Sequence, residues 1–306
     1  MKIAIAGGSG FVGQHLADYL IEKGHDIYVL SRKERKSSNP KLHYIQWMNN
    51  GSTPEKYLEG INVVINLAGK SINDRWTEEA KQQIVQSRVK STRELIRIID
   101  FLDQKPSIVI NASAVGIYGT SRTETFTEKS TPQGNDFLAS TVEAWEYEAS
   151  QFKDFSIRTI LLRFGIILGE QGALPKMVLP YKYFAGGTVG SGEQWVSWIH
   201  VDDVVRLIEF AIEQPTIAGP VNAASPNPVQ MKTFGQTIAK VLGRPHWIPA
   251  PSFALKGLLG EMSLLVLEGQ KVLPKQALIS GFTFSFPHLE EALVSILRSS
   301  KQPVLK

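Results

Sequence analysis

The segment that most restricts the fold lies at the start of the chain, where an apolar run stops at a cluster of glycines. Residues 2–6 read KIAIA, residues 7–13 read GGSGFVG, and residues 12–23 carry apolar side chains at helical spacing. Gly7 is expected to make a tight turn with positive φ. Gly10 would let the backbone approach a diphosphate, and Gly13 would let the helix pack closely on the sheet. Strand, glycine turn and helix together predict a dinucleotide site at the helix N-terminus, the alternative being a turn that serves packing alone.

Further apolar runs and helical patterns alternate along the first half of the chain. Strands are expected at 26–31, 43–47, 62–69, 107–113 and 157–165, and helices at about 76–103 and 136–152. Strands separated by helices indicate parallel βαβ units, and strands that are apolar throughout indicate a sheet covered on both faces. The predicted fold is therefore α/β, a doubly wound parallel (Rossmann) sheet that binds ligands at the carboxyl ends of its strands.

The end of the second predicted strand bears on the choice between NAD and NADP. An acidic residue at this place would accept a hydrogen bond from the ribose of NAD, but the chain has Ser31 and Arg32, followed by Lys33. A hydroxyl and a guanidinium suit the extra phosphate of NADP, because arginine binds phosphate in a forked geometry. The sequence predicts NADP(H) as the cofactor. The alternative is that Arg32 is an exposed loop cation.

Beyond about residue 165 glycine and proline become frequent and the alternation loosens. We expect residues 1–165 to form an NADP-binding Rossmann domain and residues 166–306 to form a smaller substrate-side lobe. The last part of this lobe, at about 249–297, is expected to consist of short helices with the segment GFTFSF.

Composition excludes several classes of function. The net charge is +4 and the basic residues are scattered, so no nucleic-acid surface is expected. The chain has no cysteine, its six histidines are far apart, and no metal site is predicted. Neither the glycine-rich N-terminus nor the apolar stretch 255–273, which contains four charged residues, is typical of a leader or a membrane span. We expect a cytoplasmic protein that does not bind membranes.

Several motifs together resemble those of one protein family. The glycine turn, NLAG at 66–69, SAVGIYG at 113–119 and WIHVDD at 198–203 are similar to those of the extended short-chain dehydrogenase/reductase superfamily. With AGKSI, ALPKM and QWVSWIHVDD, the chain looks like the atypical NAD(P)-dependent epimerase branch of YfhF/YfcH-like proteins, which ends in a domain of unknown function. The resemblance covers essentially the whole chain.

The resemblance implies roles for individual residues in binding the cofactor. Residues 9–12 would line the diphosphate, the loop after the fourth strand would pass along the ribose, and Arg88 on the long helix would point back toward the cofactor. The residues so implied are Ser9, Gly10, Phe11 and Val12 in the turn and Leu67, Ala68, Gly69 and Lys70 in the loop. Relatives often dimerise through the helices at about 76–103 and 136–152, so a homodimer is left open.

The chain departs from the catalytic members of the superfamily at one point. Those members pair a serine at the end of the fifth strand with a Tyr-x-x-x-Lys pair on the next helix, in which the phenolate moves the proton. Here Leu138 and Val142 stand at the corresponding positions, and neither can carry a proton. The Tyr19–Lys23 pair has the right spacing but lies on the first helix, so it is interpreted as a coincidence.

Other side chains are candidates for the missing chemistry. Ser113 suits a hydroxyl that contacts a substrate oxygen, or it is a strand-end serine bonded to backbone, and Tyr118 is either a proton donor or a wall residue. Arg163 would contact an acidic substrate or brace the lobe. Trp198 would line a pocket or belong to the core, and His200 would contact substrate or be structural.

Two classes of function follow. The first is an NADP-dependent oxidoreductase or epimerase-like enzyme that acts on a small polar, sugar-like substrate without the Tyr–Lys pair. The second is a non-catalytic NADP-binding sensor or interaction protein. The missing pair favours the sensor, whereas NLAG, Ser113 and WIHVDD favour the enzyme.

Overall fold

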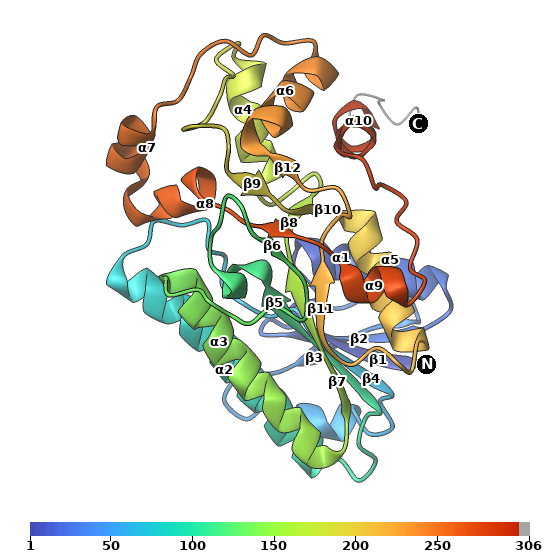
Figure 1. The fold of residues 1–306 in the computed structure, drawn as a ribbon. Coiled ribbons are helices and arrows are strands. Elements are labelled where there is room, and N and C mark those ends of the chain that lie inside the picture. The colour runs from blue at the N-terminus through green and yellow to red at the C-terminus, as the bar shows by residue number, and fades with distance from the viewer. Residues whose placement is uncertain (300–306) are drawn as a thin grey trace. The chain divides into compact units, whose positions relative to one another are not determined.

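The computed structural model describes residues 1–299, which divide into two compact units that interleave along the chain (Figure 1). The first unit contains Met1–Ala114, Ser140–Arg163 and Val205–Val221; the second contains Val115–Ala139, Phe164–Val204 and the chain from Asn222 onward. The chain thus passes from one unit to the other several times. As a division into functional regions, the predicted boundary at residue 165 stays a prediction.

The first unit is built on a seven-stranded sheet in the order β11-β7-β5-β4-β1-β2-β3. The strands are β1 (Lys2–Ala6), β2 (Asp26–Ser31), β3 (Leu42–Gln46), β4 (Val63–Asn66), β5 (Ile108–Ala114), β7 (Arg158–Phe164) and β11 (Gly219–Ala223). The pairs β1–β2, β1–β4, β2–β3 and β4–β5 are parallel, and Ile3 lies between Ile27 and Val63. The predicted Rossmann fold is confirmed. Six of these strands coincide with predicted ones, and β11 was not predicted.

Helices cover both faces of this sheet. They are α1 (Phe11–Glu22), α2 (Glu78–Phe101), α3 (Phe137–Ser150) and α5 (Val201–Glu213), with the short 3₁₀ helices η1 (Pro54–Tyr57) and η3 (Gln151–Phe155). On one face, Leu95 and Ile98 of α2 pack with Ala4 and Val64 of the strands. Helices α2 and α3 run side by side there (Figure 1), and Arg93 of α2 pairs with Glu148 of α3.

On the other face α1 lies beside α5, where the Tyr19 hydroxyl donates a hydrogen bond to Glu209. The Tyr19–Lys23 pair is thus occupied by a carboxylate of α5, since Lys23 also pairs with Glu209 at 3.6 Å. This contact fixes two helices against each other. It agrees with the interpretation that the spacing of the pair is a coincidence.

Local sequence explains where the helices begin and end. Helix α2 starts after Thr77, whose hydroxyl accepts from the Ala80 N–H at 3.1 Å, and Glu78 and Glu79 lie in its positive first turn. Helix α1 ends before Gly24, which adopts φ +92° and allows the chain to reverse into β2. The chain therefore leaves β1 and β4 at the carboxyl edge of the sheet and returns along α1 and α2.

The second unit has its own core and short paired strands. Its helices are α4 (Leu174–Lys182), α6 (Met231–Leu242), α7 (Ser252–Leu259), α8 (Leu264–Leu267), α9 (Lys275–Ile279) and α10 (Leu289–Ser299), with 3₁₀ helices η2 (Val115–Tyr118) and η4 (Gly260–Ser263). Its strand pairs are β8 (Ile166–Leu168) with β10 (Trp198–His200), β9 (Trp195–Val196) with β12 (Val229–Gln230), and β6 (Thr125–Phe126) with β13 (Lys271–Val272). Helices α4, α6 and α10 enclose a core that includes Tyr181, Trp198, Phe234 and Leu293.

Candidate functional site

Two glycines of the first turn are required by the backbone itself. Gly7 follows β1 with φ +79°, and a Cβ on it would lie 2.6 Å from the carbonyl carbon of Leu67. A Cβ on Gly13 would lie 2.3 Å from the Gly7 carbonyl oxygen and 2.5 Å from the Gly8 Cα. Any side chain would therefore push the helix away from the strand. The predicted positive φ of Gly7 and close packing of Gly13 are confirmed.

Gly10 differs from these two glycines. It is exposed, its φ of −84° suits any residue, and its one close Cβ contact would be the Gly7 carbonyl oxygen at 3.3 Å. It stands at the N-cap of the twelve-residue α1, where no side chain caps the helix. Ser9 is exposed, and Phe11 and Val12 are half-buried. Backbone strain does not demand a glycine at residue 10, and a Cβ there would require only a small shift at the Gly7 carbonyl oxygen, whereas a ligand that approached the main chain would demand a glycine.

The loop after β2 is held by its own hydrogen bonds. The Ser31 hydroxyl donates to the Lys33 carbonyl at 2.8 Å and accepts from the Lys33 N–H at 3.2 Å. The Arg32 side chain is exposed, and its carbonyl accepts from Nδ2 of Asn49 at 2.6 Å. This loop thus presents a cation on a fixed main chain at the carboxyl edge of the sheet.

The loop after β4 lies against the glycine turn. The Leu67 N–H donates to the Ala6 carbonyl at 2.8 Å, and a Cβ on Gly7 would lie 2.6 Å from the Leu67 carbonyl group and 2.8 Å from the Ala68 nitrogen. A Cβ on Gly69 would lie 3.2 Å from Cζ of Arg88, so the guanidinium is packed against this loop. Lys70 is fixed by its N–H, which donates to Ser87 at 2.9 Å, while its ammonium bonds to Gln83.

Arg88 of α2 is a half-buried cation that bonds to main-chain carbonyls. Its Nη1 donates to the carbonyls of Lys70 and Ile84 at 3.1 and 2.9 Å, and its guanidinium lies 5.0 Å from the centroid of the Trp145 ring. Burial lowers the pKa of Arg88 to about 10, and within residues 1–299 no carboxylate is paired with it. A guanidinium withdrawn from water in this way is stabilised by an anion.

A buried amide network holds the ends of β4 and β5 together. Nδ2 of Asn66 donates to Oδ1 of Asn111 at 2.7 Å and to the Thr92 hydroxyl at 3.1 Å, and Oδ1 of Asn66 accepts from the Ala68 N–H at 3.2 Å. The Trp145 indole also donates to Thr92, at 3.2 Å. The network fixes the main chain that leads into the loop after β4.

A second buried cluster joins β5, α3 and β7. The Ser113 hydroxyl donates to Oε1 of Glu146 at 2.5 Å, and Arg163 donates from Nε to Oε1 and from Nη2 to Oε2, both at 2.8 Å. The side chains of Arg163 and Glu146 are only 6% and 12% exposed. The carboxylate therefore accepts the only hydroxyl hydrogen of Ser113 and leaves that oxygen with lone pairs alone.

Glu146 was missed by the sequence analysis. It lies one turn beyond Val142 on α3, and neither its spacing nor its neighbours in the sequence mark it. One signal was present, because Arg163 occurs inside the apolar run TILLRF and a buried arginine needs a carboxylate partner.

The other predicted site residues belong to the second unit. Tyr118 is buried, stacks on Phe126 at 5.4 Å and donates its hydroxyl hydrogen bond to Oδ1 of Asn222 at 2.8 Å. Trp198 is fully buried, and its indole donates to the Asn227 carbonyl at 3.2 Å. These contacts favour a wall role for Tyr118 and a core role for Trp198.

His200 is also tied into the second unit. Its Nδ1 accepts from the Asp202 N–H at 3.1 Å, its Nε2 lies 3.0 Å from the Ser295 hydroxyl, and its ring stacks on Phe286 at 4.0 Å. Since Ser295 donates its own hydrogen to the Ala292 carbonyl, Nε2 of His200 carries the proton. The ring joins β10 to α10, which favours the structural role.

The structure thus assembles the predicted cofactor residues, Ser113 and Arg163 within one unit, and places Tyr118, Trp198 and His200 in the other. Across residues 1–299, no three acidic or histidine side chains converge on one point as metal ligands would. Within the same range, every helix is too short or too polar to cross a membrane.

Two protein-family profiles match this chain, one over most of its length and the other near its C-terminal end. The profile of the NAD dependent epimerase/dehydratase family matches residues 3–224, and that of a domain of unknown function, DUF1731, matches residues 250–296. The epimerase family protein YfhF of Bacillus subtilis is 52% identical over 301 residues, which cover 98% of this chain and 99% of that protein.

Solved structures are similar over nearly the whole length. The human epimerase family protein SDR39U1, solved with NADPH, is 31% identical with a TM-score of 0.87 and is matched over 97% of this chain and 99% of its own. A nucleoside-diphosphate sugar epimerase from Corynebacterium glutamicum is 30% identical with a TM-score of 0.78, over 97% of this chain and 58% of its own. The resemblance predicted from the motifs is confirmed.

Proposed function

We propose that this chain, which belongs to the NAD-dependent epimerase/dehydratase family, binds NADP(H) and uses it in an oxidoreductase or epimerase-type reaction on a small polar, sugar-like substrate. The observation that carries the proposal is the half-buried side chain of Arg88, whose guanidinium lies against Gly69 and has no paired carboxylate among the described residues. The loop that contains Gly69 adjoins the glycine turn, so a cofactor diphosphate held at this turn supplies the missing negative charge.

The residues of the first unit fit such a cofactor. Exposed Gly10 at the uncapped start of α1 admits the close approach of a diphosphate, and the fixed loop that carries Arg32 offers a guanidinium to a 2′-phosphate. The human relative solved with NADPH supports the choice of NADP over NAD.

NADP(H), when bound, supplies a hydride acceptor or donor. The chain supplies a proton path that differs from the Tyr–Lys pair. Because Glu146 accepts the hydrogen of Ser113, the oxygen of Ser113, a residue only 2% exposed, keeps its lone pairs, and in this proposal they accept from a substrate hydroxyl that enters beside it. Oxidation of that hydroxyl would transfer its proton to Ser113 while the Ser113 hydrogen moves to Glu146. Arg163 holds the carboxylate in place throughout.

Cofactor binding is tested by titration calorimetry of the purified protein with NADPH and with NADH. We expect NADPH to bind more tightly, and Gly10→Ala to weaken both cofactors by at least about tenfold because the new methyl occupies the path of the diphosphate. Gly257→Ala is the matched control, since a Cβ there meets open space within α7 and should leave both affinities unchanged. No affinity for either cofactor in the wild-type protein would refute the proposal.

The alternative function is an NADP(H)-binding sensor without turnover, and Leu138 and Val142 at the Tyr and Lys positions are the observation that favours it. The two functions are separated by incubating NADP⁺ with sugars and polyols, and NADPH with carbonyl compounds, while nicotinamide absorbance is followed at about 340 nm. Turnover that is lost in Ser113→Ala supports the enzyme. Tight NADPH binding with no turnover across both panels supports the sensor.

A further inference from the structure

Asn49 connects two loops at the carboxyl edge of the sheet. It lies in the loop after β3, and its side-chain Nδ2 donates to the main-chain carbonyl of Arg32 at 2.6 Å. No inference from the sequence pointed to this asparagine. The contact fixes the main chain of the residue whose side chain is expected to meet the 2′-phosphate.

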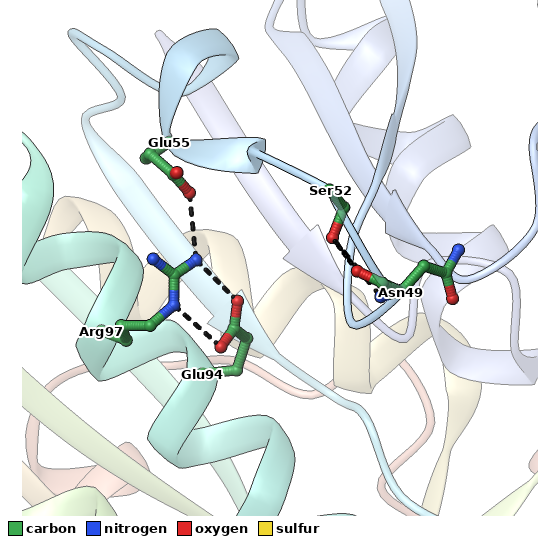
Figure 2. Close-up of polar contacts among 5 residues, drawn as sticks. All are labelled: Asn49, Ser52, Glu55, Glu94 and Arg97. Atoms are coloured by element: carbon green, nitrogen blue, oxygen red, sulfur yellow. Dashed lines mark hydrogen bonds and ion pairs between the residues drawn. The ribbon is translucent and has the colours of Figure 1, made fainter.

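The asparagine is itself held firmly. Its carbonyl accepts from the Ser52 hydroxyl at 2.9 Å and from the Ser52 N–H at 3.1 Å, and its N–H donates to the same hydroxyl at 3.4 Å (Figure 2). Asn49 is therefore a rigid support, because both its main chain and its side chain are hydrogen-bonded.

The base of this loop is joined to helix α2. Arg97 of α2 donates from Nη2 to Glu55 of η1 at 3.0 Å and to Glu94 at 2.8 Å, and from Nε to Glu94 at 3.0 Å (Figure 2). The hydrogen bonds with Glu94 raise the pKa of Arg97, so its guanidinium stays charged toward both carboxylates. The loop that contains Asn49 is thus anchored at its start by β3 and at its end by the bond between Glu55 of η1 and Arg97 of α2.

Two sets of hydrogen bonds fix the main chain at Arg32. Within the loop, the Ser31 hydroxyl bonds to the main chain of Lys33, so that these bonds span Arg32, and from the loop after β3 the Asn49 side chain donates to the Arg32 carbonyl. The exposed Arg32 side chain loses conformational entropy when it binds phosphate. Because its main chain is already fixed, binding does not also cost the entropy of ordering the backbone.

We infer that Asn49 is a positioning residue for the recognition of the 2′-phosphate, and that it contributes to the preference for NADP(H) over NAD(H) by holding Arg32. The inference rests on the proposed function and deepens it. It assigns part of the cofactor specificity to a residue that contacts the protein main chain instead of the cofactor.

The test measures the affinities of NADPH and NADH by calorimetry for the wild type, Asn49→Ala and Asn49→Asp. Loss of one hydrogen bond that orders the loop is expected to weaken NADPH about fivefold in Asn49→Ala and to leave NADH within about twofold. Asn49→Asp keeps the shape but removes the donor and sets a carboxylate against the Arg32 carbonyl, so NADPH should weaken further. Asn50→Asp is the matched control, because Asn50 is exposed and the same charge is added there with the Asn49 bond intact.

A second arm uses Arg32→Ala. If Asn49 acts through Arg32, adding Asn49→Ala to Arg32→Ala changes the NADPH affinity by less than about twofold. Equal loss of NADPH and NADH in Asn49→Ala, no loss of either, or an Asn50→Asp variant that matches Asn49→Asp would overturn the inference while leaving the proposed function intact. A wild type without preference for NADPH, or a preference unchanged by Arg32→Ala, would overturn the assignment of NADP and this inference together.

Discussion

Replacing Glu146 by alanine tests the buried cluster between β5, α3 and β7. The change removes three hydrogen bonds of 2.5 to 2.8 Å and leaves the guanidinium of Arg163, which is 6% exposed, without its bidentate carboxylate. Loss of one partner of a buried ion pair costs about 3–5 kcal/mol. We expect about 3 kcal/mol, because Glu146 retains some contact with water.

Glu148 offers an internal control on the same helix. It also binds an arginine with two hydrogen bonds, from Nε of Arg93 at 2.9 Å and from Nη2 at 2.5 Å, but the side chain of Arg93 is 65% exposed. Without its partner, Arg93 is hydrated at once, so Glu148→Ala should cost clearly less than Glu146→Ala, even though Glu148 is 6% exposed and also accepts from Nε2 of Gln151 at 3.2 Å. The comparison separates the burial of the cation from the number of bonds lost.

The assay is urea unfolding followed by circular dichroism, with slopes compared among the wild type, Glu146→Ala, Glu146→Gln and Glu148→Ala. Glu146→Gln keeps the size of the side chain and one acceptor for Ser113, and it should lose about half as much stability as Glu146→Ala. A loss of less than about 1 kcal/mol in Glu146→Ala, or a loss no larger than that in Glu148→Ala, would show that burial of Arg163 does not set the cost.

Three further changes have defined outcomes. Arg158 donates to four main-chain carbonyls at and after the end of α5, at 2.8 to 3.0 Å, so Arg158→Met should cost about 2 kcal/mol in urea unfolding; a loss below about 0.5 kcal/mol would show that water replaces it. Gly13→Ala should lower the thermal midpoint as well as NADPH affinity because its methyl meets backbone at 2.3 Å, and an unchanged melting curve would contradict that contact. Burial, and secondarily Lys232, lowers the pKa of His246 in the folded protein. As the pH falls through about 6.5, the His246 ring is therefore protonated in the unfolded chain before it is protonated in the folded one, and the stability of the folded protein declines. In His246→Gln the fall in midpoint between pH 7 and 5 should be smaller; an identical slope would exclude His246 as its source.

The sheet could be predicted from sequence except at its edge. Apolar runs such as KIAIA and the glycine turn indicate β1 and α1 directly, and both lie where they were expected. Strand β11 reads GPVNA, which is typical of a loop because of its glycine and proline. Proline is tolerated there since β11 is the outermost strand, and the order of strands is a tertiary property that local patterns do not contain.

The candidate site was predictable where a motif fixes the main chain and not where side chains meet across elements. The positive φ of Gly7 follows from the spacing of the glycines. Glu146, in contrast, is 33 residues from Ser113 and 17 from Arg163, and only the packing of α3 on the sheet brings the three together. The bond from Asn49 to the Arg32 carbonyl is invisible for the same reason, because a main-chain acceptor leaves no trace in the sequence.

The outermost position of β11 also determines how the molecule is made. The other six strands of the sheet are complete by Phe164, but their last neighbour is synthesised only at Gly219–Ala223. Until the ribosome has released that segment, β7 presents unpaired amides and carbonyls to other nascent chains. A chain that ended between these two points would therefore keep β7 as an exposed edge strand, which is a template for pairing with another chain.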